Sequence, residues 1–246
     1  DAFLFGLKGL SIDRNLISLD ELKMIDCERV YLALDKNIFN SDLDYLEEVL
    51  CLIDSLNLKG ILFYDLSVMN ICKRLGIRKD LVVFQEHLNA SLYSNNFYKK
   101  RGIKDIVISN DITKEEINEI GKHNSLMLIC YGYLPIFYSR RYLISSYLDY
   151  IKHDKESGNY YIKNNDDKYP IIEEKSGTTI YTKMPINLIN EVDSLNIEYI
   201  ILNATLINKD YFLNVLKSYL DNIGDNKSHY TGFLDRKTVY KVKDYE

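Results

Sequence analysis

Short apolar runs alternate with longer amphipathic segments along most of the chain. The runs are almost entirely apolar, which is typical of strands buried on both faces, and the segments between them carry apolar residues at helical spacing. Strands are predicted at Ala2–Leu7, Val30–Leu34, Ile61–Tyr64, Leu81–Phe84, Ile106–Ile108, Met127–Tyr131 and Tyr199–Leu202. Helices are predicted at Leu16–Ile25, Leu43–Leu56, Val68–Leu75, Leu92–Lys100, Lys114–Ile120, Ser139–Ile151 and Tyr211–Ile223.

This alternation predicts an α/β fold with a parallel sheet, because strands joined through helices need crossover connections. A closed β/α barrel uses eight units in about 250 residues. Seven units, with the chain opening directly on a strand, favour a TIM-type β/α barrel that lacks its first βα unit. A doubly wound open sheet is the alternative. A missing unit leaves two strand edges bare, so we expect the C-terminal tail or a second copy in a dimer to cover them.

A segment with a different pattern separates the sixth and seventh units. Short strands are predicted at Tyr160–Ile162, Ile171–Glu174 and Gly177–Tyr181, which indicates a small antiparallel β elaboration. The expected organisation is therefore barrel units over residues 1–152, the inserted β elaboration over 153–193, the last barrel unit over 194–229 and a strand-like tail over 230–246.

Composition is that of an ordinary globular chain, with 46% hydrophobic and 27% charged residues. The longest apolar runs are too short to cross a bilayer, so no membrane contact is expected. A net charge of −5 gives no general attraction to nucleic acid, and such a contact would need a local patch such as Lys99–Arg101. Four scattered cysteines favour a reducing, cytoplasmic compartment.

Polar residues after the predicted strands are the first candidates for a site, since the carboxyl ends of barrel strands build active sites. Asp35 and Asp65 end the second and third strands, and neither signal is specific. His87 follows the fourth strand beside Glu86 and is a candidate acid–base residue. Adjacent residues of an extended segment point to opposite sides, which favours a structural histidine. The other histidines lack metal-site spacing, so no metal is predicted.

The richest strand end lies around residues 131–141. Ser139 is placed as the N-cap of the following helix, which puts Arg140 and Arg141 in its first turn. Cations oppose the helix dipole there unless an anion sits against the helix start, where backbone N–H groups and guanidinium groups converge on it. The pattern predicts a phosphate or carboxylate site at these three residues. Pairing of both arginines with acidic surface residues is the simpler alternative.

Several segments match one known family. They are Asp1–Lys8, Tyr31–Lys36, Ile112–Ile117 and Tyr138–Ser145, with Gly177–Ile180 and Thr231–Leu234 matching a smaller branch. In these segments the chain resembles the collagenase-like peptidase family U-32, and Asp1–Lys8 resembles that family's second barrel strand. The smaller branch is a Firmicute-type one, often found beside a larger paralogue.

The resemblance implies two kinds of activity. The family was first described as peptidases, hydrolases without agreed catalytic residues, while better-understood members take part in hydroxylation of transfer RNA wobble uridine, ribosomal RNA or ubiquinone precursors. Several carry an iron–sulfur cluster. Where the family signature has a Glu, a His and two Cys around its glycine, Gly132 here, this chain has Met127, Tyr131, Pro135 and Tyr142. Clusters are held by thiolates, so no cofactor is expected.

Three functions stay open at this point, and so does whether the chain is itself an enzyme. The first is a degenerate family member acting as an accessory protein in transfer RNA wobble-uridine hydroxylation, with a larger family paralogue and transfer RNA as partners. The second is a genuine peptidase with Ser139 as nucleophile and His87 as base, although Ser139 is better explained as a helix cap. The third is a binding module for a small carboxylate, using Arg140 and Arg141.

Overall fold

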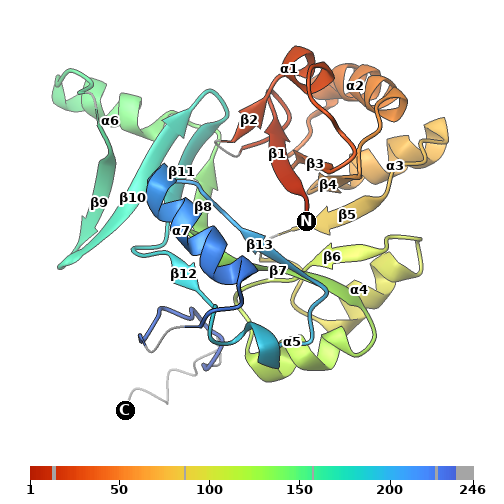
Figure 1. Cartoon of the computed structure of the whole chain (residues 1–246). Helices are drawn as coiled ribbons and strands as arrows, with labels where there is room; N and C mark the ends of the chain where they lie inside the picture. The colour runs from red at the N-terminus through yellow and green to blue at the C-terminus, as the bar shows by residue number, and fades with distance from the viewer. Residues whose placement is uncertain (13–14, 86, 157, 225–226, 237–246) are drawn as a thin grey trace. The chain divides into compact units, whose positions relative to one another are not determined.

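The computed structural model describes residues 1–12, 15–85, 87–156, 158–224 and 227–236 (Figure 1). The chain divides into two compact units. The first contains residues 1–129, 191–201 and 232 onward, and the second contains residues 130–190 and 202–231. No helix within the described ranges is long and apolar enough to cross a membrane.

The first unit is an alternation of strands and helices. Its strands are β1 (Phe3–Leu7), β2 (Leu16–Ile17), β3 (Val30–Leu34), β4 (Gly60–Phe63), β5 (Leu81–Phe84), β6 (Asp105–Val107), β7 (Ser125–Gly132) and β13 (Tyr199–Leu202), the last two running into the second unit. Its helices are α1 (Leu19–Lys23), η1 (Asn40–Asp42), α2 (Leu43–Ser55), α3 (Leu66–Leu75), α4 (Leu92–Lys99), α5 (Lys114–Gly121) and η2 (Val192–Ser194).

The central sheet is mostly parallel, and from β1 through β3 to β7 it follows the order of the chain. Strands β2, β1, β3, β4, β5, β6 and β7 are parallel neighbours, and β12 (Ile186–Asn187) and β13 both pair with β7. The two-residue β2 lies on the other side of β1 from β3, so the strand order reverses at β1. Over the described residues the sheet does not close, so the α/β architecture is confirmed and the barrel is not.

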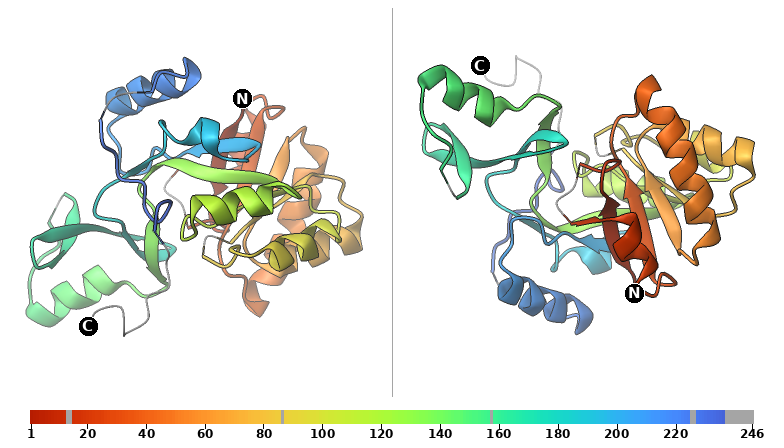
Figure 2. Two further views of the ribbon diagram at one scale, coloured as in Figure 1. Left: turned by 90° about the horizontal axis from the view of Figure 1, so that it is seen from below. Right: turned by 90° about the horizontal axis from the view of Figure 1, so that it is seen from above.

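The sheet is nevertheless strongly curved. The Lys59 ammonium lies 5.4 Å from the centre of the Tyr31 ring on β3 and 5.9 Å from that of Tyr199 on β13. In a flat sheet the five strand spacings between β3 and β13 would separate these strands by about 24 Å. The concave face therefore encloses a core, and helices α2 to α5 lie on the outer side (Figure 2). The core contains Ala33, Leu62, Val82, Val107 and Met127, with Leu4, Tyr31, Phe84, Tyr199 and Ile201 packed against it.

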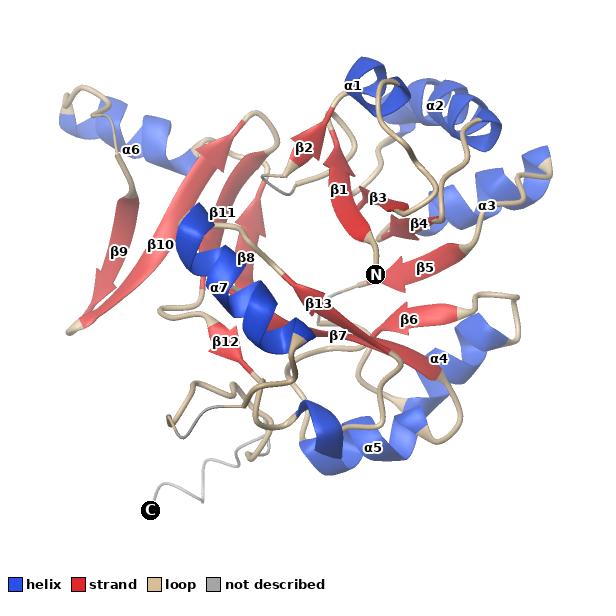
Figure 3. Ribbon diagram, in the orientation of Figure 1, coloured by secondary structure: helices blue, strands red, loops and turns tan. Residues whose placement is uncertain are grey.

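The second unit contains an antiparallel sheet (Figure 3). Its strands are β8 (Pro135–Ser139), β9 (Tyr160–Asn164), β10 (Asp167–Glu174) and β11 (Gly177–Tyr181), in the order β8, β11, β10, β9. Its helices are α6 (Leu143–Ile151) and α7 (Lys209–Leu220). The predicted antiparallel elaboration is confirmed, and β8, which the sequence did not predict, forms one of its edges.

Two helix predictions were wrong at their starts. Leu16 and Ile17 form β2 beside β1, and the helix begins only after Ser18, whose side chain and that of Glu21 form a capping box. Ser139 is paired with Thr178 in the β8–β11 ladder, so it ends a strand and α6 begins at Leu143.

The predicted C-terminal strand is absent from its described part. Residues 232–235 form a turn, the residues on either side of it are not in a strand, and the prediction beyond residue 236 lies outside the described residues. The segment is anchored in the first unit by Leu234, which is 3% exposed and whose carbonyl accepts a hydrogen bond from the backbone N–H of Lys114.

Candidate functional site

Both strand-end aspartates predicted from the sequence bind backbone amides. The Asp35 carboxylate accepts a hydrogen bond of 3.0 Å from the backbone N–H of Ile12. Asp65 caps α3 by accepting from the N–H of Ser67 at 2.9 Å, and its second oxygen accepts from the N–H of Ile38 at 3.1 Å. These bonds tie neighbouring βα loops together, so Asp65 has a structural role at the edge where a site was expected.

His87 has a carboxylate partner that sequence reasoning did not pair with it. Its Nδ1 lies 2.5 Å from Oδ2 of Asp111, which follows β6, and both side chains are about half exposed. Glu86, the neighbour considered from the sequence, lies outside the described residues. A carboxylate at Nδ1 orients the imidazole ring, as the aspartate of a catalytic triad does for its histidine base. Twenty-four residues separate the two side chains, and no local motif links them.

Gly132 lies where the ends of β7 and β13 approach each other most closely. Its φ is +123°, and a Cβ atom at this position would come within 2.5 Å of the carbonyl oxygen of Asn203. The preceding Tyr131 is 1% exposed. Burial, together with nearby Tyr211, raises the pKa of Tyr131 to about 12. A glycine is therefore required here by backbone packing.

The loop that carries Arg140 and Arg141 is held by hydrogen bonds from the strand and turn beside it. Thr178 donates its hydroxyl to the Arg141 carbonyl at 2.6 Å and accepts from the N–H of Leu143 at 3.0 Å. The Tyr138 hydroxyl donates to the Ser176 carbonyl at 2.6 Å. Both arginines are exposed. Backbone fixation of this kind presents two adjacent guanidinium groups from one rigid edge.

The helix start behind this loop is already occupied by a carboxylate. Glu173, whose side chain is 3% exposed, accepts hydrogen bonds from both the backbone N–H and the hydroxyl of Ser145 in the first turn of α6. Lys155 lies 3.1 Å from the same carboxylate. Burial raises the pKa of Glu173, but these hydrogen bonds and the ammonium lower it further, to below its ordinary value. The protein itself thus supplies the anion that a helix N-terminus attracts.

Ser139 and the two arginines consequently lie elsewhere than the sequence predicted. Ser139 ends β8, and its hydroxyl accepts a hydrogen bond of 3.2 Å from the backbone N–H of Arg141. The arginines precede α6, whose N-cap residue is Tyr142. They are brought together on the outside of the second unit, whereas His87 and its partner Asp111 belong to the first unit. An anion site at the arginines does not depend on the helix dipole.

Comparison with known proteins places the chain in a family. Residues 14–241 match the family model described as peptidase family U32. The chain belongs to this family. It is 26% identical to "tRNA hydroxylation protein P2" of Bacillus subtilis (strain 168), over 97% of this chain and 92% of that protein. It is 28% identical to "Uncharacterized protease MJ0090" of Methanocaldococcus jannaschii, over 60% of this chain and 39% of that protein. No solved structure matches it significantly.

Several members of the family are expected to carry an iron–sulfur cluster. The residues at the two cysteine positions of the family signature in this chain do not fit one. Pro135 begins β8 and carries no donor, and Tyr142 donates its hydroxyl to the Lys175 carbonyl at 3.2 Å. Neither supplies a thiolate. Within the described part of the chain, no group of three or more His, Cys, Asp and Glu could hold a metal ion.

Proposed function

We propose that this U32 protein is an accessory component of transfer RNA wobble-uridine hydroxylation and that it binds the RNA. Its partner is a larger member of the same family, which carries out the oxidation. The role of this chain is to hold RNA phosphates through a fixed cationic edge, and no redox step is assigned to its residues. A family member without thiolates at the two cluster positions fits a binding role.

One of the two comparisons supports the choice of RNA. The similarity to the Bacillus subtilis protein named for transfer RNA hydroxylation covers nearly the whole of both chains. The match to the archaeal protein named as a protease covers 39% of that protein. The first similarity therefore extends over both compact units of this chain, including the arginine-bearing loop.

The observation that carries the proposal is the cationic edge formed by Arg140, Arg141 and Lys175. The turn bearing Lys175 is bound to the arginine loop through the hydroxyls of Tyr138 and Tyr142. All three cations are exposed, and over the described residues neither Arg141 nor Lys175 is paired with a carboxylate. Guanidinium forks match phosphate oxygens, so a rigid pair with a neighbouring ammonium is suited to an RNA backbone.

Mass spectrometry of transfer RNA nucleosides tests the proposal in cells. A deletion strain is compared with its parent and with strains carrying the wild type, the Arg140→Ala/Arg141→Ala variant or Arg78→Ala as a control for an exposed arginine in the first unit. We expect deletion to abolish wobble-uridine hydroxylation, and the wild type and Arg78→Ala to restore it. Failure of the double variant to restore it assigns the effect to the cationic edge. An unchanged nucleoside profile after deletion refutes the proposal.

Binding measured in vitro separates the cationic edge from an indirect effect. The affinity of the purified chain for transfer RNA should fall as the salt concentration rises. The slope of log affinity against log salt concentration should become shallower by about 0.7 to 0.9 for each phosphate-binding cation that is removed. The double variant should therefore bind more weakly and respond less to salt than the wild type. Equal salt slopes for the two proteins would contradict a phosphate contact at these residues.

A peptidase is the alternative that the paired His87 and Asp111 favour. The Asp111 carboxylate orients the His87 ring through Nδ1, which is the arrangement that positions a general base. A protease assay on the wild type, His87→Ala and Ser139→Ala decides this alternative. Activity that is lost in His87→Ala, together with an unchanged nucleoside profile, would favour hydrolysis over RNA modification.

A further inference from the structure

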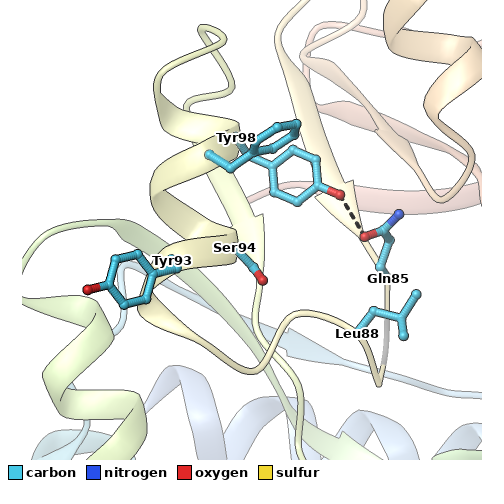
Figure 4. A pocket seen from close by; sticks show the side chains of 6 residues that line it. Gln85, Leu88, Tyr93, Ser94 and Tyr98 are labelled. Carbon is cyan, nitrogen blue, oxygen red and sulfur yellow. Dashed lines mark hydrogen bonds between the residues drawn. The ribbon is translucent and has the colours of Figure 1, made fainter.

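A cavity of about 460 Å³ opens beside α4 in the first unit (Figure 4). It is separate from the arginine-bearing loop, which belongs to the second unit. Its walls combine aromatic and aliphatic side chains with one amide and three hydroxyls. The lining residues are Gln85, Leu88, Tyr93, Ser94, Phe97 and Tyr98.

Large apolar side chains of this wall are left in solvent. Tyr93 is 86% exposed, Leu88 62% and Phe97 41%. Tyr93 and Phe97 are four residues apart on α4, so their rings lie on the same face of the helix. Tyr98 is only 8% exposed, and its hydroxyl donates to Gln85. α4 therefore buries one aromatic side chain and exposes two others, Tyr93 and Phe97.

Two cations directly follow the end of α4. Arg101 lies four residues after Phe97, and its guanidinium lies 3.5 Å from the centre of the Phe97 ring and donates to the Phe97 carbonyl at 3.3 Å. Lys100, beside it, is exposed. In the described part of the chain neither residue is paired with a carboxylate. The aromatic wall is therefore bordered by uncompensated positive charge, although the protein as a whole carries a net charge of −5.

The polar groups of the cavity are held in place. The Gln85 amide donates to the Tyr64 carbonyl at 2.9 Å and accepts from the Tyr98 hydroxyl at 2.8 Å. Among the described residues, each of its polar atoms makes one of its two possible hydrogen bonds, which leaves one donor on the nitrogen and one acceptor position on the oxygen. A fixed amide with one donor and one acceptor is suited to the edge of a nucleobase.

We propose that this face of α4 binds an unpaired nucleotide of RNA. The base stacks on Tyr93 and Phe97, and the phosphate lies against Arg101 and Lys100. The choice of RNA as occupant rests on the proposed function, while the surface itself supplies the reason for an unpaired nucleotide. Stacking needs an exposed aromatic ring and a free base, and a phosphate needs a nearby cation. A purely apolar partner helix would leave both cations unpaired.

Binding of a fluorescein-labelled single-stranded oligouridylate, followed by fluorescence anisotropy, tests this proposal. The full chain is compared with Tyr93→Ala, Arg101→Ala and Arg101→Lys. Tyr150→Ala is the matched control, since Tyr150 on α6 is 85% exposed, like Tyr93. Because Tyr93 is so exposed, its truncation leaves the fold intact. Loss of one stacked base should weaken binding roughly 5- to 150-fold, and Tyr150→Ala should bind like the wild type.

Arg101→Lys separates charge from stacking. The lysine keeps the positive charge but loses the planar group that covers Phe97, so it should retain the salt dependence that Arg101→Ala loses. Photocrosslinking with a 4-thiouridine oligonucleotide, followed by peptide mass spectrometry, locates the base. We expect the crosslink within residues 88–98.

Equal affinity of Tyr93→Ala and the wild type, or crosslinks confined to other peptides, overturns the proposal. Binding of an apolar peptide at α4 that oligouridylate does not displace also overturns it. Failure here is distinguishable from failure of the proposed function. The nucleoside profile of the deletion strain and the effect of the Arg140→Ala/Arg141→Ala variant do not depend on α4.

Discussion

Replacement of Gly177 by alanine should displace the arginine-bearing loop. Gly177 begins β11 with φ at +133°, and a Cβ atom there would meet the carbonyl oxygen of Ser139 and lie 2.8 Å from Cα of Arg140. Both contacts are with backbone, which cannot rotate away as a flexible side chain would. The variant therefore either strains the β8–β11 pairing or moves the loop outward.

Gly158 provides a control with nearly the same backbone. Its φ is +136°, but a Cβ atom there would meet nothing within 4 Å. Alanine at either position carries the backbone penalty of about 1–3 kcal/mol for a conformation that glycine favours. Only Gly177→Ala adds overpacking, which typically costs a further 1–3 kcal/mol or so. The difference between the two variants isolates the close approach.

Urea denaturation followed by circular dichroism measures this difference, and hydrogen exchange of residues 137–141 and 176–180 locates it. We expect Gly177→Ala to be less stable than Gly158→Ala by about 1–3 kcal/mol, with faster exchange in both segments and weaker binding of transfer RNA. Equal stabilities and unchanged exchange would show that Gly177 does not hold the loop in place, and would remove the structural reason for a rigid cationic edge.

Three further predictions concern other parts of the chain. Because the pKa of Glu173 is lowered in the folded protein, its carboxylate stabilises the fold at pH values above the ordinary glutamate pKa of about 4.3, and this stability is lost as the pH falls through the pKa of the folded state. In thermal melts at a series of pH values, Glu173→Gln should be less stable than the wild type at pH 7 and approach it in acid. Iodoacetamide should modify the exposed Cys51 in the native protein. Burial raises the thiol pKa of Cys72 to about 12 and also raises that of Cys130, so these two should react only after unfolding, which mass spectrometry can show. Asp65→Ala removes a helix cap and a loop tie, and urea titration should show a loss of about 1–2 kcal/mol.

The strands of the central sheet could be predicted because their signal is local. Val30–Leu34 and Leu81–Phe84 are apolar runs that lie between helices, and the structure has strands with the same bounds. Strand β8 was missed because its pairing partner, around Thr178, lies about forty residues further along the chain. A serine before two charged residues is equally compatible with a helix cap, and only the long-range pairing decides between them.

The residues of the candidate site could be predicted where they form a local feature of the sequence, but not where they depend on long-range contacts. Arg140 and Arg141 could be selected because adjacent arginines are a local feature, but Glu173 fills the helix start from a strand that follows the helix. The aromatic face of α4 did leave a signal in the sequence. Tyr93, Phe97 and Arg101 recur at intervals of four residues, which is the spacing of one helix face.

Tyr142 connects the lost ligand chemistry with the proposed binding role. It stands at a position where the family signature carries a cysteine, and its hydroxyl instead bonds the carbonyl of Lys175, joining the turn that bears this cation to the arginine loop. A cysteine at this position would be too short to make the same bond. The side chain at this position therefore offers no thiolate, and it ties the turn that bears Lys175 to the arginine loop. That coupling is what a protein would need if it kept the family's fold and exchanged a cofactor site for a phosphate-binding edge.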